Sequence, residues 1–377
     1  RIRIPWYVSF LGGLGCLVAM FLIEPIAGAA AVVAEIVLWT LLSRREQRVR
    51  WGDARRGLYE SLIRWALVRL ARRPLSARNW RPHVLVFVDG PVRELELVRF
   101  ANWFAQGRGV VTVCELLVED PSAGRVDLAA HRRAMQEALD AENLVVFAEV
   151  DVVADLVEGV VSVAQANGMA GMASNTILLG WPRDSALQAR FLRLLTPLER
   201  LHKSLVLGRV LPRSFPSHER SARTIHVWWG GLQRNGDLML LLAWLLTRNP
   251  AWRGARVEVL SLALNEAGRK QTETFLNQLI PEIRIEAEPR VILKPRDRSV
   301  AELIHEHSAG ADAVFMGLAT PEPGEEAAYA ERLENLAGDL PTVFFVKNSS
   351  LFVGGLLELT EAARDQAGET ASPGSGS

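Results

Sequence analysis

The stretch NWRPHVLVFVDGP, residues 79–91, contains an apolar run from Val84 to Val88 that ends at Asp89-Gly90. A short apolar run closed by turn residues predicts a strand that is buried on both faces. Asp89 and Gly90 then stand at the carboxyl end of the strand, where open α/β sheets bind their ligands. Asp89 is therefore a candidate for accepting a hydrogen bond from a ligand. Asp-Gly is also common turn chemistry, so a purely structural turn remains an alternative.

Apolar runs of strand length continue along the chain and alternate with segments of helical periodicity, which predicts an α/β fold with mainly parallel sheets. A first group of strands is expected at residues 84–88, 110–117, 144–148, 176–180 and 205–210. A second group is expected at residues 224–229, 256–262, 283–286, 313–317 and 342–346. We therefore expect two α/β halves, 79–211 and 224–361, with a linker at 212–223 and a flexible tail at 362–377.

Glycines at two other predicted strand ends are further candidates for ligand contact. Gly180 ends one strand of the first half. In the second half, Gly230, Gly231 and Gly236 crowd a strand-to-helix turn, where backbone amides can hold an anion. A tight structural turn is the alternative interpretation of these three glycines.

The sequence lacks the motifs of several common enzyme classes. It contains no G-x-G-x-x-G after a strand, no Walker A run and no G-x-S-x-G elbow, so we expect no enzyme activity and no required cofactor. His305 and His307 are two apart on a predicted helix, where their side chains diverge, so no metal site is expected. The 43 basic and 43 acidic residues balance, which disfavours a nucleic-acid partner.

Two apolar segments precede the α/β region. Residues 6–23 carry no charge, and residues 26–42 carry only Glu35. Each has about the length of a membrane-spanning helix, which predicts a transmembrane hairpin over residues 1–43. Arginines flank both outer ends, so both ends are expected on the cytoplasmic side of the plasma membrane, with the α/β domain in the cytoplasm.

A basic amphipathic helix is predicted at residues 51–73, within a bridge that covers residues 44–78. It stops at Pro74 and would lie in the interface of the lipid bilayer. An ordinary surface helix is the alternative. The residues expected at the membrane interface are Arg44, Arg45, Arg48, Arg55, Arg56 and Trp65.

The order of these features resembles the C-terminal portion of cation-chloride cotransporters, in the amino acid/polyamine/organocation superfamily. The matching pieces are the two apolar segments, VRWGDARRGL (49–58), NWRPHVLV (79–86), MASNTILLGW (172–181) and the segment that begins TIHVWWGGLQRNGDL (224–238). The chain departs from the pattern in two places. His83 replaces the usual glutamine, and Arg234-Asn235 stand where the family has two acids.

The resemblance implies a regulatory and dimerisation region of a secondary transporter that couples cations to chloride, or ions to amino acids. It implies two halves similar to universal stress proteins, a homodimer, and further membrane spans before Arg1 that hold the ion sites. In some relatives the first half holds an adenine nucleotide, which would lie near Asp89, Gly90 and Gly180. A membrane-tethered, universal-stress-protein-like nucleotide sensor is the alternative.

Overall fold

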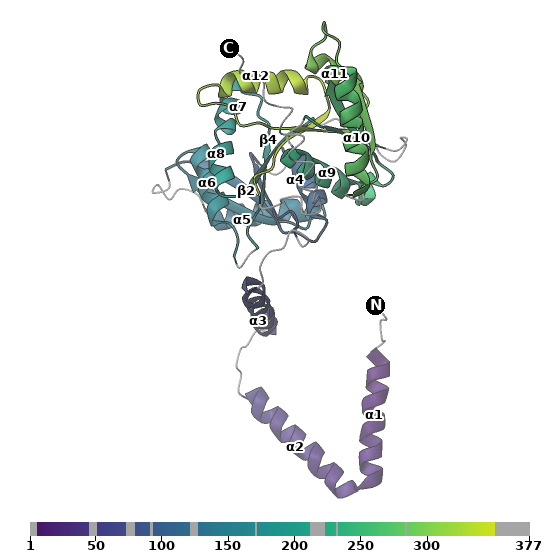
Figure 1. Ribbon diagram of the computed structural model, residues 1–377. Coiled ribbons are helices and arrows are strands. Elements are labelled where there is room, and N and C mark those ends of the chain that lie inside the picture. Colours follow the sequence, from purple (N-terminus) through teal and green to yellow (C-terminus); the bar gives the residue numbers. More distant parts are fainter. Residues whose placement is uncertain are drawn as a thin grey trace. The chain divides into compact units, whose positions relative to one another are not determined.

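The computed structural model describes residues 6–44, 51–72, 80–90, 93–120, 127–169, 172–211, 223–230, 233–282 and 285–350. The chain divides into two compact units, Arg1–Val68 and Arg69–Ser377 (Figure 1). The predicted linker, except Arg223, and the predicted tail lie outside the described residues.

The first unit is helical. Helix α1 (Trp6–Ile23) and helix α2 (Pro25–Arg44) are joined at Glu24 and contact each other, and helix α3 (Trp51–Ala71) follows. Gly28 is buried, and a Cβ built on it would lie 3.5 Å from the Phe21 ring. Among the residues that the structure describes, none of the helices combines the length and apolar character needed to cross a membrane. The two helices are thus observed where they were predicted, and their transmembrane character stays a prediction.

In the described part of the second unit, ten strands form one sheet. Their order is β3-β2-β1-β4-β5-β10-β9-β6-β7-β8. Neighbouring strands are parallel, except β5 and β10, which are antiparallel. The bounds are β1 Val84–Val88, β2 Val111–Val118, β3 Phe147–Val153, β4 Thr176–Gly180, β5 Ser204–Val210, β6 Thr224–Trp228, β7 Arg256–Ala263, β8 Glu288–Leu293, β9 Ala313–Gly317 and β10 Thr342–Lys347. The mostly parallel α/β fold is confirmed, and both predicted groups of strands share a single sheet.

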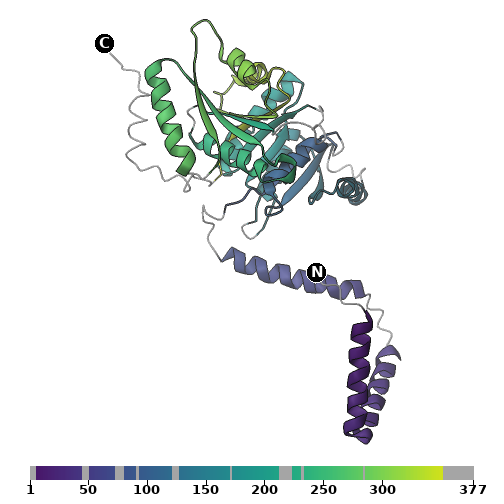
Figure 2. The same cartoon turned by 90° about the vertical axis from the view of Figure 1, so that its right-hand side faces the viewer.

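Helices cover both faces of this sheet (Figures 1 and 2). One face packs against α4 (Leu95–Ala105), α5 (Leu128–Ala141), α9 (Gln233–Thr247) and α10 (Glu266–Glu282), together with the short 3-10 helix at Pro250–Trp252. The other packs against α6 (Leu156–Ala166), α7 (Ser185–Leu192), α8 (Leu195–Arg200), α11 (Val300–Ser308) and α12 (Glu326–Ala337). Each half therefore supplies helices to both hydrophobic cores.

Two predicted strands are displaced in the structure, and both lie at the edges of the sheet. The strand predicted at 144–148 is observed as β3, and the strand predicted at 283–286 is observed as β8. In β3 the buried Ala148 and Val150 alternate with partly exposed Glu149 and Asp151, so no continuous apolar run marks the strand. Strand β8 contains Pro289, which an edge strand tolerates because one of its sides has no hydrogen-bonding neighbour.

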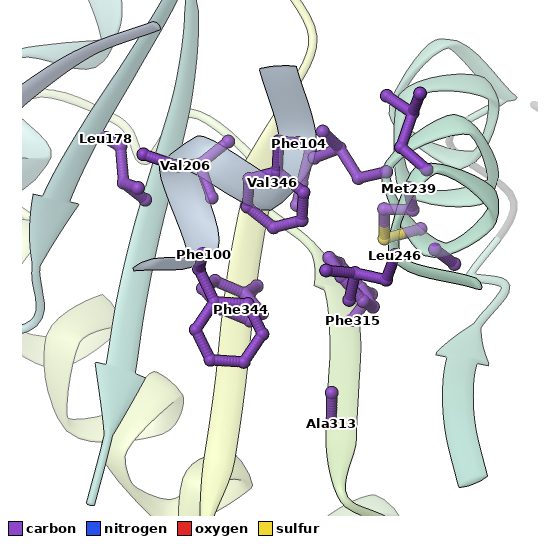
Figure 3. Close-up of a cluster of buried hydrophobic side chains, with 14 of the residues drawn as sticks. Phe100, Phe104, Leu178, Val206, Met239, Leu246, Ala313, Phe315, Phe344 and Val346 are labelled. Atoms are coloured by element: carbon purple, nitrogen blue, oxygen red, sulfur yellow. The ribbon is translucent and has the colours of Figure 1, made fainter. Parts of the chain in front are cut away.

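Aromatic side chains from both halves meet in the core beside the β5–β10 pair (Figure 3). The Phe344 ring on β10 lies 4.8 Å from Phe100 and 5.6 Å from Phe104, both on α4 of the first half. It also stacks on Phe315 of β9 at 5.1 Å. All four side chains are fully buried. The two halves therefore share this core. An aromatic cluster of this kind adds specific ring contacts to the burial of apolar area.

Replacing Phe344 by Ala should destabilise the domain by about 3–5 kcal/mol, because it opens a cavity beneath α4. Urea unfolding measures the change. The matched control is Phe147→Ala, which removes the same atoms from an edge strand where the side chain is 59% exposed. Equal shifts of the unfolding midpoint for the two variants would contradict the shared core.

The segments NWRPHVLV and MASNTILLGW contact each other in the structure. The backbone N–H of His83 donates to Asn175 Oδ1 (3.1 Å), and Asn175 Nδ2 donates to the Arg81 carbonyl (2.7 Å). The His83 ring accepts a hydrogen bond at Nδ1 from the Val110 N–H (3.1 Å). These bonds fix the start of β1 against β4 and β2, so this histidine acts as a neutral acceptor.

His83→Gln should make the domain less sensitive to acid. Burial, with a smaller contribution from the Arg81 charge, lowers the pKa of His83. Protonation at Nδ1 would also remove the acceptor of the Val110 N–H. A lowered histidine pKa gives stability that is full above about pH 6.5 and is lost as the pH falls toward the native value. Thermal unfolding between pH 7 and pH 5 should therefore show a larger loss of Tm for the wild type than for the glutamine variant, whose amide oxygen still accepts. Identical pH profiles would exclude this role.

Candidate functional site

A cavity of about 340 Å³ opens at the carboxyl ends of β4 and β5. Its wall is formed by the start of α4, by the residues that end β4 and β5, and by Glu334 of α12. Strand β1 lies between β2 and β4, so the order of the strands reverses beside this cavity. This is the position at which open α/β sheets bind ligands.

Glu94 closes the end of β1. Its Oε2 accepts a hydrogen bond from the Asp89 N–H at 2.8 Å, and its Oε1 lies where a Cβ on Gly180 would be. Gly180 is therefore needed for the close approach of this carboxylate. Burial raises the pKa of Glu94, and the nearby Asp89 charge adds to this rise, while the hydrogen bond from the Asp89 N–H opposes it.

The opposite wall is a hydrogen-bond network between the two halves. Glu334 on α12 accepts from Trp181 Nε1 (2.7 Å), Gln188 Nε2 (3.0 Å) and Arg209 Nη1 (3.0 Å), all from the first half. Arg209 Nη2 also donates to the carbonyls of Ala337, Gly338 and Leu340 at the end of α12. A cation at a helix C-terminus is favourable, so Arg209 stabilises α12 while it holds the two halves together.

The cavity carries three positive and three negative side chains. They are Arg93, Arg183, Arg209, Glu94, Glu96 and Glu334. Arg93 pairs with Asp89 at 3.2 Å, and Glu96 Oε1 pairs with Arg99 Nη1 at 2.5 Å. Two further polar atoms, Glu96 Oε2 and Arg209 Nε, are buried without a hydrogen-bond partner among the described residues. Arg183 is exposed and has no ion-pair partner in the part of the chain that the structure describes.

The structure brings three of the predicted ligand residues to this corner. Gly180 lies in the cavity wall, and Asp89 is linked to it through Glu94. Gly90 has a positive φ of 85°, which a glycine adopts without strain. The Asp89 side chain is 91% exposed and pairs with Arg93. Ligand binding by these residues stays a prediction, and Glu94 was not identified from the sequence.

The predicted glycine turn of the second half has a different environment. Gly230 follows β6 and is exposed, and Gly231 lies outside the described residues. Gly236 is buried inside α9, where a Cβ would collide with the Trp229 ring. Close packing accounts for Gly236, while anion binding by the turn stays a prediction.

The predicted membrane-interface residues belong to the first unit. Arg44 is the last residue of α2, and Arg45 and Arg48 lie outside the described residues. Arg55 lies in α3, and Arg56 Nε pairs with Glu60 at 2.8 Å. Trp65 is 60% exposed. Contact of these residues with a bilayer stays a prediction.

Comparison with known proteins supports the fold of the second unit. No family model matches the sequence. The chain is similar to the crystal structure of the cytoplasmic domain of a prokaryotic cation chloride cotransporter, with a TM-score of 0.52 and 18% sequence identity, over 72% of this chain and 96% of that one. A universal stress protein from Archaeoglobus fulgidus aligns with a TM-score of 0.44 and 13% identity, over 71% of this chain and 97% of that one. The first likeness shows a shared fold, and the second is too weak to support an inference.

Gly180→Ala should destabilise the domain by about 1–3 kcal/mol, because the added methyl group displaces the Glu94 carboxylate from the Asp89 N–H. In a Glu94→Ala background the same change should cost clearly less, since the colliding atoms are gone. Chemical denaturation of the four proteins in this cycle gives the coupling. Gly230→Ala is the control, because a Cβ there meets nothing within 4 Å. Strictly additive effects of the two changes would exclude the contact.

Proposed function

We propose that the chain is the regulatory and dimerisation C-terminal region of a secondary membrane transporter resembling cation-chloride cotransporters. The full protein would carry cations with chloride, or amino acids with ions, in the plasma membrane. The observation that carries this proposal is the fold likeness, which covers 96% of the cytoplasmic domain of a prokaryotic cation chloride cotransporter. The α/β unit would accordingly lie in the cytoplasm.

The helical first unit supports a membrane location. Large apolar side chains on α1 and α2 are exposed, among them Leu22, Ile23 and Ile26 near the connection at Glu24. Exposed apolar surface on this scale marks an interaction with lipid or with other helices. The proposal assigns it to the bilayer and to membrane spans that precede Arg1. Helix α3, on which Leu62, Trp65 and Arg56 are exposed, would lie at the interface.

A regulatory role suits the way in which the second unit is built. The continuous sheet and the Arg209–Glu334 network hold the two halves together as one rigid body. A rigid body attached to a membrane hairpin can bias the transport cycle when a ligand or a second copy changes its position.

A homodimer is part of the proposal. Light scattering in detergent tests it against the mass of one chain, 41.7 kDa, and a single-chain mass contradicts it.

A membrane-tethered nucleotide sensor is the second candidate. It is favoured by the cavity at the strand-order reversal, where Gly180 and Asp89 lie close together. The charges there oppose it. Glu94 and Glu96 stand at the start of α4, where a phosphate would otherwise meet the positive end of the helix. The transporter region is therefore the better supported function.

The full-length gene product, reconstituted in liposomes, should take up rubidium or amino acids in a manner that depends on a chloride or cation gradient. Arg209→Ala, which removes the hydrogen bonds from β5 to α12, should change the uptake rate several-fold, because it loosens α12 against the first half while the continuous sheet keeps the halves joined. The control is Arg253→Ala, an exposed arginine of the second half.

Either of two results would overturn the proposal. One is a coding sequence upstream of Arg1 that encodes no further apolar spans. The other is uptake that is unchanged when residues 80–377 are deleted.

A further inference from the structure

We propose that the cavity at the ends of β4 and β5 binds a small zwitterion, namely an amino acid with an apolar side chain. This site goes beyond the proposed function, because it depends only on the residues of the cavity wall. It also gives the cavity a ligand of a different class from a nucleotide.

The balance of charge selects a zwitterion. Three arginines and three glutamates line the cavity, so its formal charge is zero. A polyanion would meet the Glu94 and Glu96 carboxylates at close range, in a partly buried site where like charges repel strongly. A simple cation would meet the arginines in the same way. A ligand that carries one charge of each sign is complementary to both sets.

Two groups are placed to receive those charges. Arg183 is exposed at the mouth and has no ion-pair partner among the described residues, so its guanidinium is available to a carboxylate. The Glu334 side chain is 46% exposed and remains accessible to an ammonium group. These groups come from the loop after β4 and from α12, so the ligand would span the two halves.

The remaining surface and the size of the cavity fix the rest of the ligand. Leu97, Trp181, Pro182, Val210 and Leu211 contribute apolar wall. A volume of about 340 Å³ stands at the lower end of the range for ligand pockets, about 300–1,000 Å³, which favours a small molecule. An aliphatic amino acid such as leucine matches these features.

Isothermal titration of the whole chain tests the inference with four probes. L-leucine should bind, while 4-methylpentanoate, which lacks the ammonium group, and 3-methylbutylamine, which lacks the carboxylate, should each bind at least tenfold more weakly. ATP should not compete with leucine. The proposal would be overturned if either analogue bound as tightly as leucine, or if ATP displaced leucine. It would also be overturned if leucine did not bind at about 10 mM, because a dissociation constant above this value corresponds to a binding free energy of less than about 3 kcal/mol.

Two pairs of variants locate the site. Arg183→Ala and Glu334→Gln should each weaken leucine binding at least tenfold. Their controls, Arg200→Ala and Glu331→Gln, change exposed residues outside the cavity wall and should leave binding unchanged. Arg183 makes no ion pair with a described residue, so its variant tests the site even if Glu334→Gln destabilises the hydrogen-bond network between the two halves. Unchanged binding in Arg183→Ala would place the ligand elsewhere. The result is independent of the transport assay, which can fail while the cavity still binds leucine.

Discussion

The antiparallel pairing of β5 with β10 is the constraint on which the rest of the second unit depends. It joins two parallel five-stranded halves into one sheet, through six residue pairs from Thr342↔Val210 to Lys347↔Leu205. Phe344 stands opposite Gly208, and a Cβ on Gly208 would lie 3.0 Å from the Phe344 ring and 2.7 Å from Leu97. A glycine at this position lets the aromatic cluster reach α4. Among the strands that the structure describes, the pairing leaves β3 and β8 at the edges of the sheet.

Strands inside the sheet could be predicted from the sequence, and edge strands could not. Strands β1, β4 and β9 are buried on both faces, so their apolar runs match their observed bounds. Strands β3 and β8 alternate, and Pro289 interrupts the second, so their nearby apolar residues misled the prediction. Periodicity identifies a strand by the burial of its faces. It contains no information about which strand of one half pairs with which strand of the other.

In the candidate site too, some residues follow from a local sequence rule and others depend on long-range strand pairing. Asp89 and Gly180 follow from a local rule, because both end strands that flank the reversal of strand order. Arg209 and Glu334 are 125 residues apart in the sequence and meet only because β5 pairs with β10. Glu94 lies close to Asp89 in the sequence, but its position against Gly180 depends on the path of the chain between β1 and α4. Long-range pairing therefore brings Glu334 into the cavity wall, and no local signal marks it.

The two halves differ at equivalent corners of the sheet. In each, a side chain at the start of the helix after the first strand approaches the glycine that ends the fourth strand. These pairs are Glu94 with Gly180 and Asn235 with Gly317. Asn235 donates to the Leu318 carbonyl and accepts from the Asn348 N–H, so its amide is satisfied on both sides and fills the corner without charge. A carboxylate only accepts, so Glu94 satisfies the Asp89 N–H and leaves a partly buried charge with a raised pKa. The choice of an acid in one half and an amide in the other therefore leaves a partly buried carboxylate at the first corner, while the second corner is filled by an uncharged side chain whose amide is hydrogen-bonded on both sides.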